Sequence, residues 1–420
     1  MDLRELKGLE IAARCHVGYK DGKWLVPSQS GKGKYKVLLS ADGDACECED
    51  FQLHRVPCKH IHAARLVRER DHHGKSPVID TTAVPKRKTY KQNWPAYNLA
   101  QMTEKHRLQV LLHELCRGVE EPPRDPNKKV GRKRVPMADQ IFACAFKVYS
   151  TFSSRRFACD LNDAHERGYL SRPIHPNKVN HFLEKPELAP ILGSLIVRSS
   201  LPLRVIESQF AGDSSGFSTS RFVRWYDEKY GVTRSGKDWV KVHIMCGVTT
   251  NVVTAIEILD KNAGDAPQLP ALVGATAENF TVKEVSLDKA YLSNDNLALI
   301  AGLGATPFIP FKSNSTAGES GSLWERMFHF FQFQREEFLR HYHMRSNVES
   351  TFSMVKAKFR DHVRSKSDPA MVNEVLCKFL CHNLCCLISA HCELGIEATF
   401  WPEKEVADMH GPPALLRFPG

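Results

Sequence analysis

The chain has 420 residues, with 58 lysines and arginines against 48 aspartates and glutamates, which give a formal net charge of +10. This length predicts two to four units and excludes a single ordinary domain. There is no run of 18 apolar residues, and the charged N-terminal stretch MDLRELKGLEIAARC lacks a signal-peptide core. The 13 scattered cysteines predict reduced thiols. We therefore expect an intracellular protein without a membrane span.

The basic excess is concentrated in two runs, KRKTYK at 86–91 and KKVGRKR at 128–134. Such runs favour a polyanionic partner such as nucleic acid. A solvated charged surface has the same composition, so the charge by itself leaves both interpretations open.

Residues 1–75 form the first predicted unit. Two short strand-like runs, KWLVPS and YKVLLS, flank the turn-rich SQSGKGK and predict a hairpin. The later run HIHAARLVRER predicts a helix.

A cysteine and histidine cluster lies between this hairpin and this helix, with Cys46 and Cys48 followed by Cys58 and His60. Cys46 and Cys48 share one face of an extended strand, because successive side chains alternate. Three cysteines and one histidine suit tetrahedral structural Zn²⁺. The spacing resembles that of the SWIM zinc finger, a module often found beside DNA-processing domains. We predict this zinc site and leave open whether the finger contacts DNA or protein.

The middle of the chain is predicted to be basic and helical. Residues 76–136 read as a proline-punctuated linker with one helix. Residues 137–200 contain several short helices, which is typical of a helix-turn-helix-like DNA-binding segment. Arg132, Lys133 and Arg134 in VGRKRVP form either a minor-groove hook or a solvated charge run.

From residue 201 the pattern changes to strands and helices. Three strand-like runs come first, followed by alternating helices and strands and by a long helical segment that ends near residue 395. This order predicts an α/β fold with a mixed sheet. Residues 396–420 form a C-terminal tail.

Three carboxylates in this region suit phosphoryl transfer. Asp213 in FAGDSSGF and Asp288 in VSLDKAY follow apolar, β-branched runs, and Glu349 in YHMRSNVESTFSMVK lies in an amphipathic helix. Oxygen ligands from two strands and a helix are what a two-metal site for Mg²⁺ or Mn²⁺ requires. Taken singly, acidic residues after strands are commonly turn residues, and charged pairs on helices are commonly solvated.

The helix that carries Glu349 is expected to extend from Tyr342 through Arg345 to Lys356. At 3.6 residues per turn these four side chains fall within about 60° of one another. An apolar stripe lies beside them, made of Val348, Phe352, Val355 and Phe359. The polar stripe should therefore emerge at the edge of the core.

This tyrosine-arginine-glutamate-lysine pattern resembles the signature of DDE transposases from bacterial insertion sequences. GDSSGF resembles the strand of the first aspartate, and LDKAYLS resembles the second aspartate's stretch, with Ala290 where glycine is usual. KDWVKVHIMCGVTTNVVTAIEI, with Lys241 and His243, resembles the next strands. The resemblance covers roughly 200–395 and implies an uninterrupted ribonuclease-H-like catalytic domain at 201–395.

The resemblance also implies an activity and its partners. Asp213 would bridge two Mg²⁺ ions, and Asp288 and Glu349 would hold one each. Tyr342, Arg345 and Lys356 would contact DNA. The expected partners are double-stranded DNA at terminal inverted repeats and at a target, and a second copy of the chain. No membrane and no small-molecule substrate is expected, and the protein should be cytoplasmic and associated with the nucleoid.

Two tryptophans and a cysteine series complete the sequence-based predictions. Trp324 lies in an irregular segment, where it could stack on an unpaired base or pack at a rim. Trp239 enters a strand, which favours packing. Cys377, Cys381 and Cys385 recur every four residues, which indicates an apolar helix face.

Two other functions use the same residues. One is a transposase-derived, non-catalytic DNA-binding regulator, which would have no need of all three carboxylates. The other is a structure-specific nuclease of ribonuclease-H-like fold, which would cut DNA without joining it.

Overall fold

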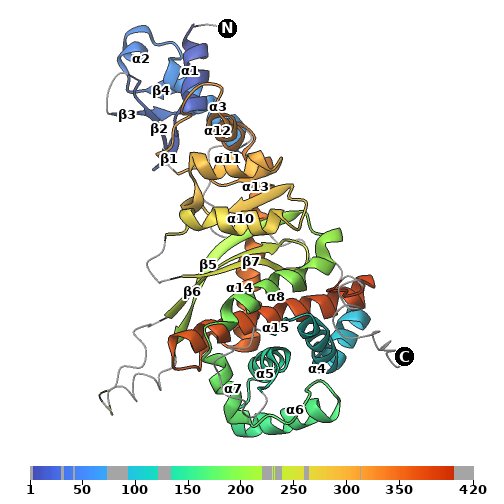
Figure 1. Ribbon diagram of the computed structural model, residues 1–420. Coiled ribbons are helices and arrows are strands. Elements are labelled where there is room, and N and C mark those ends of the chain that lie inside the picture. Colours follow the sequence, from blue (N-terminus) through green and yellow to red (C-terminus); the bar gives the residue numbers. More distant parts are fainter. Residues whose placement is uncertain are drawn as a thin grey trace. The chain divides into compact units, whose positions relative to one another are not determined.

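The computed structural model describes residues 3–29, 33–40, 43–72, 93–121, 134–219, 229, 231, 239–259, 264–312 and 314–401. Its contacts divide the chain into two units. The first combines Met1–Tyr90 with Ser286–Met344, and the second combines Lys91–Val285 with Arg345–Gly420. Figure 1 shows the helices and strands of both units. One hydrophobic cluster lies in the second unit and another in the N-terminal part of the first.

The N-terminal part of the first unit is a small antiparallel sheet with helices. The order of its strands is β1-β2-β3-β4. The predicted hairpin is confirmed as β2 and β3, where Trp24 is opposite Val37. The elements are α1 (Leu3–Arg14), β1 (Gly18–Lys20), β2 (Lys23–Pro27), β3 (Lys34–Leu38), β4 (Ala45–Cys46), α2 (Glu49–His54) and α3 (Lys59–His72).

The second part of the first unit comes from the predicted catalytic region. It contains η3 (Lys289–Tyr291), α11 (Asn294–Gly302), β9 (Thr306–Phe308), α12 (Leu323–Phe333) and α13 (Arg335–Tyr342). Arg70 of α3 joins the two parts: its Nη2 donates to Oε1 of Gln332 at 3.3 Å, and its guanidinium lies 5.5 Å from the ring centre of Phe333. The domain expected over 201–395 is divided between the two units, because residues 286–344 belong to the first unit and the rest to the second.

The second unit is a mixed sheet covered by helices. Strands β5 (Gln209–Thr219), β6 (Trp239–Gly247) and β7 (Val253–Leu259) are antiparallel neighbours. β10 (His362–Val363) pairs in parallel with the end of β5. The expected α/β fold with a mixed sheet is therefore confirmed.

Helices lie on both faces of this sheet (Figure 1). α14 (Ser346–Phe359) and α15 (Asp368–Leu394) pack on one face and α10 (Leu269–Ala277) packs on the other. The remaining elements of the second unit are α4 (Trp94–Arg117), α5 (Met137–Ser150), α6 (Ser154–Glu166), α7 (Pro176–Leu183), α8 (Leu188–Ser200), η1 (Leu201–Val205) and η2 (Ala266–Gln268). The boundary between the units falls within β8 (Glu284–Leu287).

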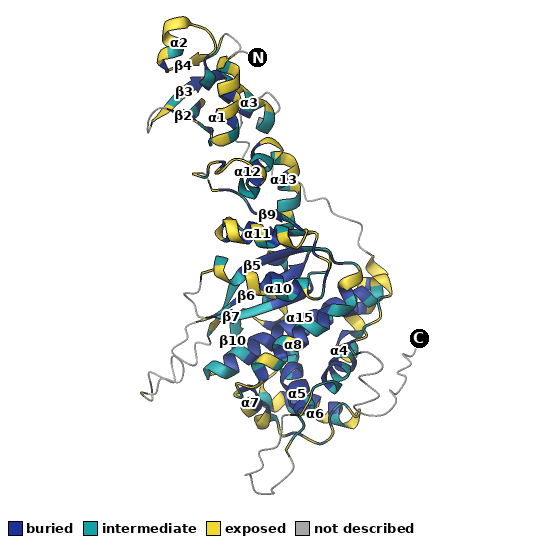
Figure 2. Ribbon diagram, turned by 45° about the horizontal axis from the view of Figure 1, so that its top comes forward, coloured by how far each residue is buried: buried dark blue, intermediate teal, exposed yellow. Residues whose placement is uncertain are grey.

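The core of the second unit surrounds α15, most of which is buried (Figure 2). This helix contacts α4, α5 and α8 as well as the sheet. Cys377 and Cys381 are fully buried, which confirms the predicted apolar face. The predicted DNA-binding segment 137–200 thus contributes α5 and α8 to the same core as the catalytic sheet.

Two helical segments, Leu188–Val205 and Asp368–Leu394, are long and apolar enough to cross a membrane by length and composition. Polar residues interrupt both segments, so neither contains an unbroken run of 18 apolar residues. The second segment is 72% buried inside the fold. A buried core helix passes the same test, so these segments are weak grounds for a membrane span.

Lys378 is a buried cation in α15 with 1% of its surface exposed. Its Nζ donates to the carbonyl oxygens of Arg360 at 3.0 Å and His362 at 2.7 Å, which fixes the chain directly after α14. Burial lowers the pKa of Lys378 to about 8.

We expect Lys378→Met to change the alkaline pH dependence of stability. The folded protein releases the Lys378 proton near pH 8, whereas the unfolded chain keeps it until about pH 10.4. The free energy of unfolding should therefore rise by about 3 kcal/mol as the pH rises through this window. Denaturant titrations should show a smaller rise in Lys378→Met. The exposed Lys178 provides the control, since Lys178→Met should keep the full rise.

Candidate active site and zinc site

Asp213 lies in the middle of β5, opposite Ile244 of β6. Side chains alternate along a strand, so Asp213 and Ser215 project from the same face. This is the face against which α14 packs, since Lys356 of α14 donates from Nζ to Oγ of Ser215 at 2.7 Å. The strand therefore presents its carboxylate to the helix that carries Glu349.

Arg345 joins the two predicted carboxylates of this unit. Its Nη1 lies 2.6 Å from Oδ2 of Asp213 and its Nη2 lies 2.5 Å from Oε1 of Glu349. The Asp213 and Arg345 side chains are 24% and 17% exposed, whereas that of Glu349 is 57% exposed. Two carboxylates brought together repel each other unless a cation lies between them, and the guanidinium fork meets this requirement here.

The expected single helix from Tyr342 to Lys356 is wrong. α13 ends at Tyr342, the 3₁₀ turn η4 (His343–Arg345) follows, and α14 begins at Ser346. Glu349 thus lies in the first turn of α14 and Lys356 in its last, where each charge complements the helix dipole. That charge order was the sequence signal for a separate, shorter helix. The apolar stripe behaves as predicted, because all four of its residues are buried.

An open hollow of about 600 Å³ lies beside these side chains, lined among others by Asp213, Ser215, Glu349 and Lys356. Burial lowers the pKa of Lys356, whose ammonium lies 5.5 Å from the ring centre of Phe217. Carboxylates and a cation therefore line the same hollow.

The opposite face of β5 and β6 carries a second polar cluster around Asp265. Its Oδ1 accepts from Ser214 Oγ at 3.1 Å and from Lys241 Nζ at 2.9 Å, and lies 3.7 Å from Nδ1 of His243. Burial opposes ionisation of Asp265, but the hydrogen bonds from Lys241 and Ser214 outweigh it and lower the pKa. Burial also lowers the pKa of His243. Sequence reasoning missed Asp265, because it lies outside every recognised motif.

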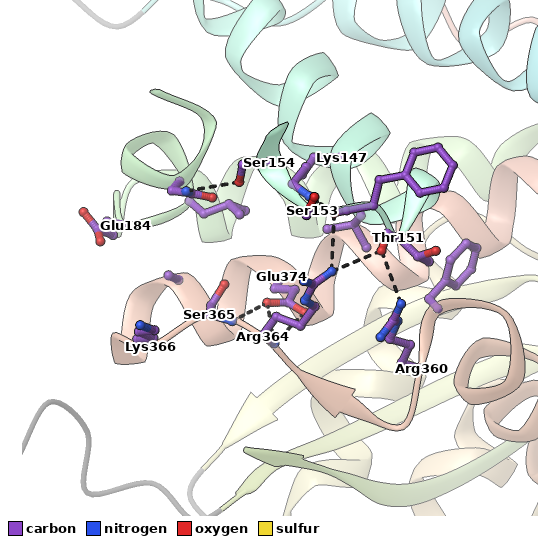
Figure 3. A pocket seen from close by; sticks show the side chains of 16 residues that line it. Lys147, Thr151, Ser153, Ser154, Glu184, Arg360, Arg364, Ser365, Lys366 and Glu374 are labelled. Atoms are coloured by element: carbon purple, nitrogen blue, oxygen red, sulfur yellow. Dashed lines mark hydrogen bonds between the residues drawn. The ribbon is translucent and has the colours of Figure 1, made fainter. Parts of the chain in front are cut away.

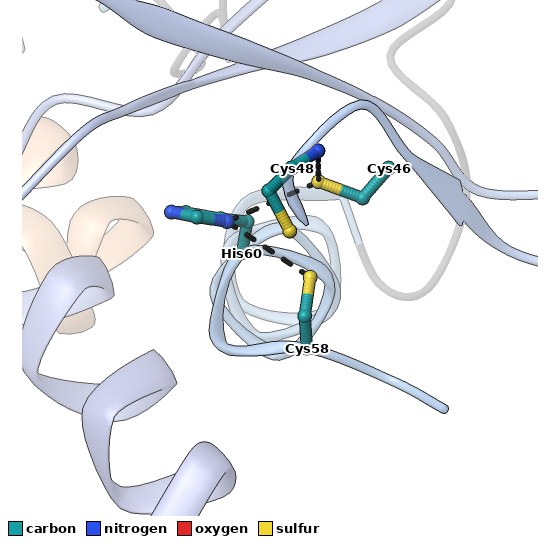
Figure 4. Close-up of side chains that lie close together, drawn as sticks. All are labelled: Cys46, Cys48, Cys58 and His60. Carbon is teal, nitrogen blue, oxygen red and sulfur yellow. Dashed lines mark hydrogen bonds between the residues drawn. The ribbon is translucent and has the colours of Figure 1, made fainter. Parts of the chain in front are cut away.

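The predicted zinc ligands form one cluster in the first unit (Figure 4). Cys46 ends β4, Cys48 precedes α2, and Cys58 and His60 lie at the start of α3. All four are buried, and their ligand atoms lie within 4.8 Å of one another. Nδ1 of His60 is 3.9 Å from the Sγ atoms of both Cys46 and Cys58.

These distances fit a zinc ion. Bonds of about 2.0–2.3 Å in a tetrahedron separate the ligand atoms by about 3.5–3.8 Å. The hydrogen bond between the thiols lowers the pKa of Cys58 to about 4 and raises that of Cys46. Cysteines bind Zn²⁺ as thiolates, so metal binding would release thiol protons.

Two family models match parts of the chain. Residues 206–384 match the model of the transposase DDE domain, and residues 35–65 match the SWIM zinc finger. This chain carries a transposase DDE domain and an N-terminal SWIM zinc finger. The DDE match spans Asp213, Asp288 and Glu349, and the finger match spans all four zinc ligands. No curated protein matches the chain.

The DDE domain makes the chain a nucleic-acid-processing enzyme of the transposase kind. Its second predicted aspartate, Asp288, directly follows β8 and belongs to the first unit. Oδ1 of Asp288 accepts from the backbone N–H of Lys289 at 2.6 Å, and the buried Tyr291 anchors the turn that follows. Ala290 lies within this 3₁₀ turn.

The other predicted DNA contacts differ in their surroundings. Trp324 donates from Nε1 to the carbonyl oxygen of Thr316 at 2.9 Å and packs edge-on against Phe311 at 5.0 Å. Tyr342 ends α13 beside His343. Arg134 is exposed, and Arg132 and Lys133 lie outside the described residues. The predicted packing of Trp239 is confirmed, since its ring lies over Gly216 of β5.

We expect Cys58→Ala to abolish stoichiometric zinc binding and to loosen the whole first unit. The finger packs on α12 and α13, so loss of the metal should expose 286–344 as well as 1–75 to protease. Metal analysis of the purified chain and limited proteolysis followed by mass spectrometry would measure both effects. Cys159 is exposed and lies outside the cluster, so Cys159→Ala should keep the zinc. New cleavage confined to 1–75 would contradict the expected coupling.

Proposed function

We propose that this protein moves its own mobile element: it binds the terminal inverted repeats, cuts the DNA there and joins the freed ends to a target. The observation that carries this proposal is the pairing of Asp213 on a central strand and Glu349 on a packed helix through one guanidinium. Carboxylates held together at the rim of a hollow form a donor set for hard divalent cations.

The donor set fits magnesium or manganese. Asp213, Asp288 and Glu349 would hold the ions, which would supply an activated oxygen nucleophile and stabilise the leaving oxygen of an in-line displacement. The Arg345 guanidinium pairs with two of these carboxylates. With those carboxylates bound to metal ions, the same guanidinium would be available to bind a DNA phosphate. Lys356 provides a point charge on the far side of the hollow.

Ser214 and Ser215 have structural hydrogen bonds and need not act as nucleophiles. Ser214 donates to Asp265, and Ser215 accepts from Lys356. Ser214 thus shares Asp265 with Lys241, and Ser215 contacts Lys356 directly. Both hydroxyl groups hold strand β5 in place.

We further propose how the rest of the chain serves this chemistry. The helices of 137–200 and the basic linker would contact double-stranded DNA, and the finger would contact DNA or protein. Two ends must be joined in one reaction, so the active form would be at least a dimer on DNA. The protein would act in the cytoplasm, at the nucleoid.

Asp213→Asn and Glu349→Gln provide the test. In a strand-transfer assay with Mg²⁺ and the inverted repeats that flank the gene, each variant should lose cleavage and joining about 10³-fold or more, because metal stabilisation contributes several kcal/mol. End binding, measured by fluorescence anisotropy, should persist. Glu278 is exposed at the end of α10 and does not line the hollow, so Glu278→Gln should react like the unaltered protein.

The same assay separates the alternative functions. A non-catalytic regulator would bind the ends without cutting them. A nuclease would cut them without joining. Full cleavage by Asp213→Asn would contradict the assigned site.

A further inference from the structure

A pocket of about 400 Å³ lies between α5, α6, α7 and the chain that follows α14 (Figure 3). It belongs entirely to the second unit and is distinct from the hollow at Asp213. Four basic residues line it, of which Lys147, Arg360 and Arg364 form one cationic wall and Lys366 is the fourth. Hydroxyl groups of Ser153 and Ser154 face this wall from the start of α6.

The three cations converge on neutral partners. Nη1 of Arg364 donates to the carbonyl oxygens of Thr151 at 3.1 Å and Phe152 at 3.3 Å. Nη2 of Arg360 donates to Thr151 at 3.4 Å, and Nζ of Lys147 donates to Phe152. Within the described residues, none of the three forms an ion pair with a carboxylate. Carbonyl contacts orient these cations without neutralising their charge.

The two acidic residues that line the pocket are already engaged. Glu374 accepts backbone N–H groups from Arg364 and Ser365 at 2.8–3.0 Å. Glu184 lies 3.3 Å from the ring nitrogen of His181. Burial and the neighbouring cation of Arg364 lower the pKa of Lys147 to about 8, which agrees with an excess of positive charge.

Two helices end at the edge of this pocket. Thr151 caps α5 with φ +54° and Arg360 caps α14 with φ +74°, in the positive-φ conformation that commonly ends a helix. These ends bring the Thr151 carbonyl within hydrogen-bond distance of Arg360.

We propose that this pocket binds a phosphate group of the DNA backbone. Three cations around one polar cavity can donate hydrogen bonds to the oxygen atoms of a phosphate group. The positive end of the α6 helix dipole adds to the attraction. The inference rests on the proposed function, in which DNA lies across this unit, and it adds a second contact point to that path.

The helix α14 sets the spacing between this pocket and the catalytic hollow. Glu349 and Arg360 are eleven positions apart along the chain of α14 and its cap, which corresponds to about 16 Å at 1.5 Å per residue. Duplex DNA advances about 3.4 Å per base pair. The bound phosphate would thus lie about five base pairs from the cleaved bond.

The salt dependence of DNA binding tests this assignment. The full-length, zinc-loaded protein would be titrated against a labelled duplex by fluorescence anisotropy without Mg²⁺ at several salt concentrations. Each phosphate contact contributes about 0.9 to the slope of log K against log salt. That value is the total for one phosphate, so Arg364→Gln and Arg360→Gln should each lower the slope by part of it and the double variant by about 0.9, whereas Arg364→Lys should keep most of the slope. Arg204 is exposed and lies outside the pocket, so Arg204→Gln should leave the slope unchanged.

Two controls make the result decisive. Thermal melting checks that each variant is folded, and Arg360→Gln, which removes only one long contact, carries the test if Arg364→Gln fails to fold. Calorimetric titration with inorganic phosphate distinguishes a free anion from DNA. Folded variants with an unchanged salt slope would overturn the proposal. The proposal would also fail if Arg364→Gln lost binding of inorganic phosphate but kept the salt slope of DNA binding, because the pocket would then bind a free anion and not DNA. Cleavage by the unaltered protein is measured separately. If the protein cuts and joins DNA but the variants keep the salt slope, only the phosphate pocket is refuted. If the variants lower the slope but the unaltered protein does not cut DNA, only the proposed function is refuted.

Discussion

The fold of the second unit depends on one constraint, the burial of α15 on almost every side. A helix without a polar face needs apolar partners all round, and α4, α5, α8 and the sheet supply them. Asn383 fixes the arrangement, since its side chain exchanges hydrogen bonds of 2.8 Å with both backbone groups of Val253 and donates to Ile196 at 3.1 Å. The helical segment 137–200 is therefore inseparable from the catalytic sheet.

The polar site follows from that packing. α14 buries Val348 and Val355 against the sheet, which brings its polar stripe to the edge of β5. There Arg345 compensates two carboxylates at once. The same helix ends at Phe359, and the carbonyl of its cap Arg360 accepts a hydrogen bond from the buried Lys378. The apolar contacts along α14 thus fix the positions of the charged residues at its two ends.

The first unit is stabilised in another way. Its small sheet and helices have a modest core, and a buried set of three cysteines and a histidine supplements it. The contact of Arg70 with Gln332 and Phe333 ties this finger to a segment that starts almost three hundred residues away from the N-terminus. Metal binding and the placement of that segment are consequently linked.

Local patterns determined much of this protein: the spacing of Cys46 and Cys48 predicted the zinc cluster, and alternation and helical periodicity predicted the strand of Asp213 and the buried stripe beside Glu349. Such patterns act over a few residues, because each reflects the geometry of one strand or one helix. Tertiary structure alone decided the contact of Arg345 with Asp213, the contact of Asp265 with Lys241 and the pocket that joins Arg364 to Thr151 across 213 positions. Those contacts depend on which distant segments share a core, and burial of side chains from many elements determines that choice.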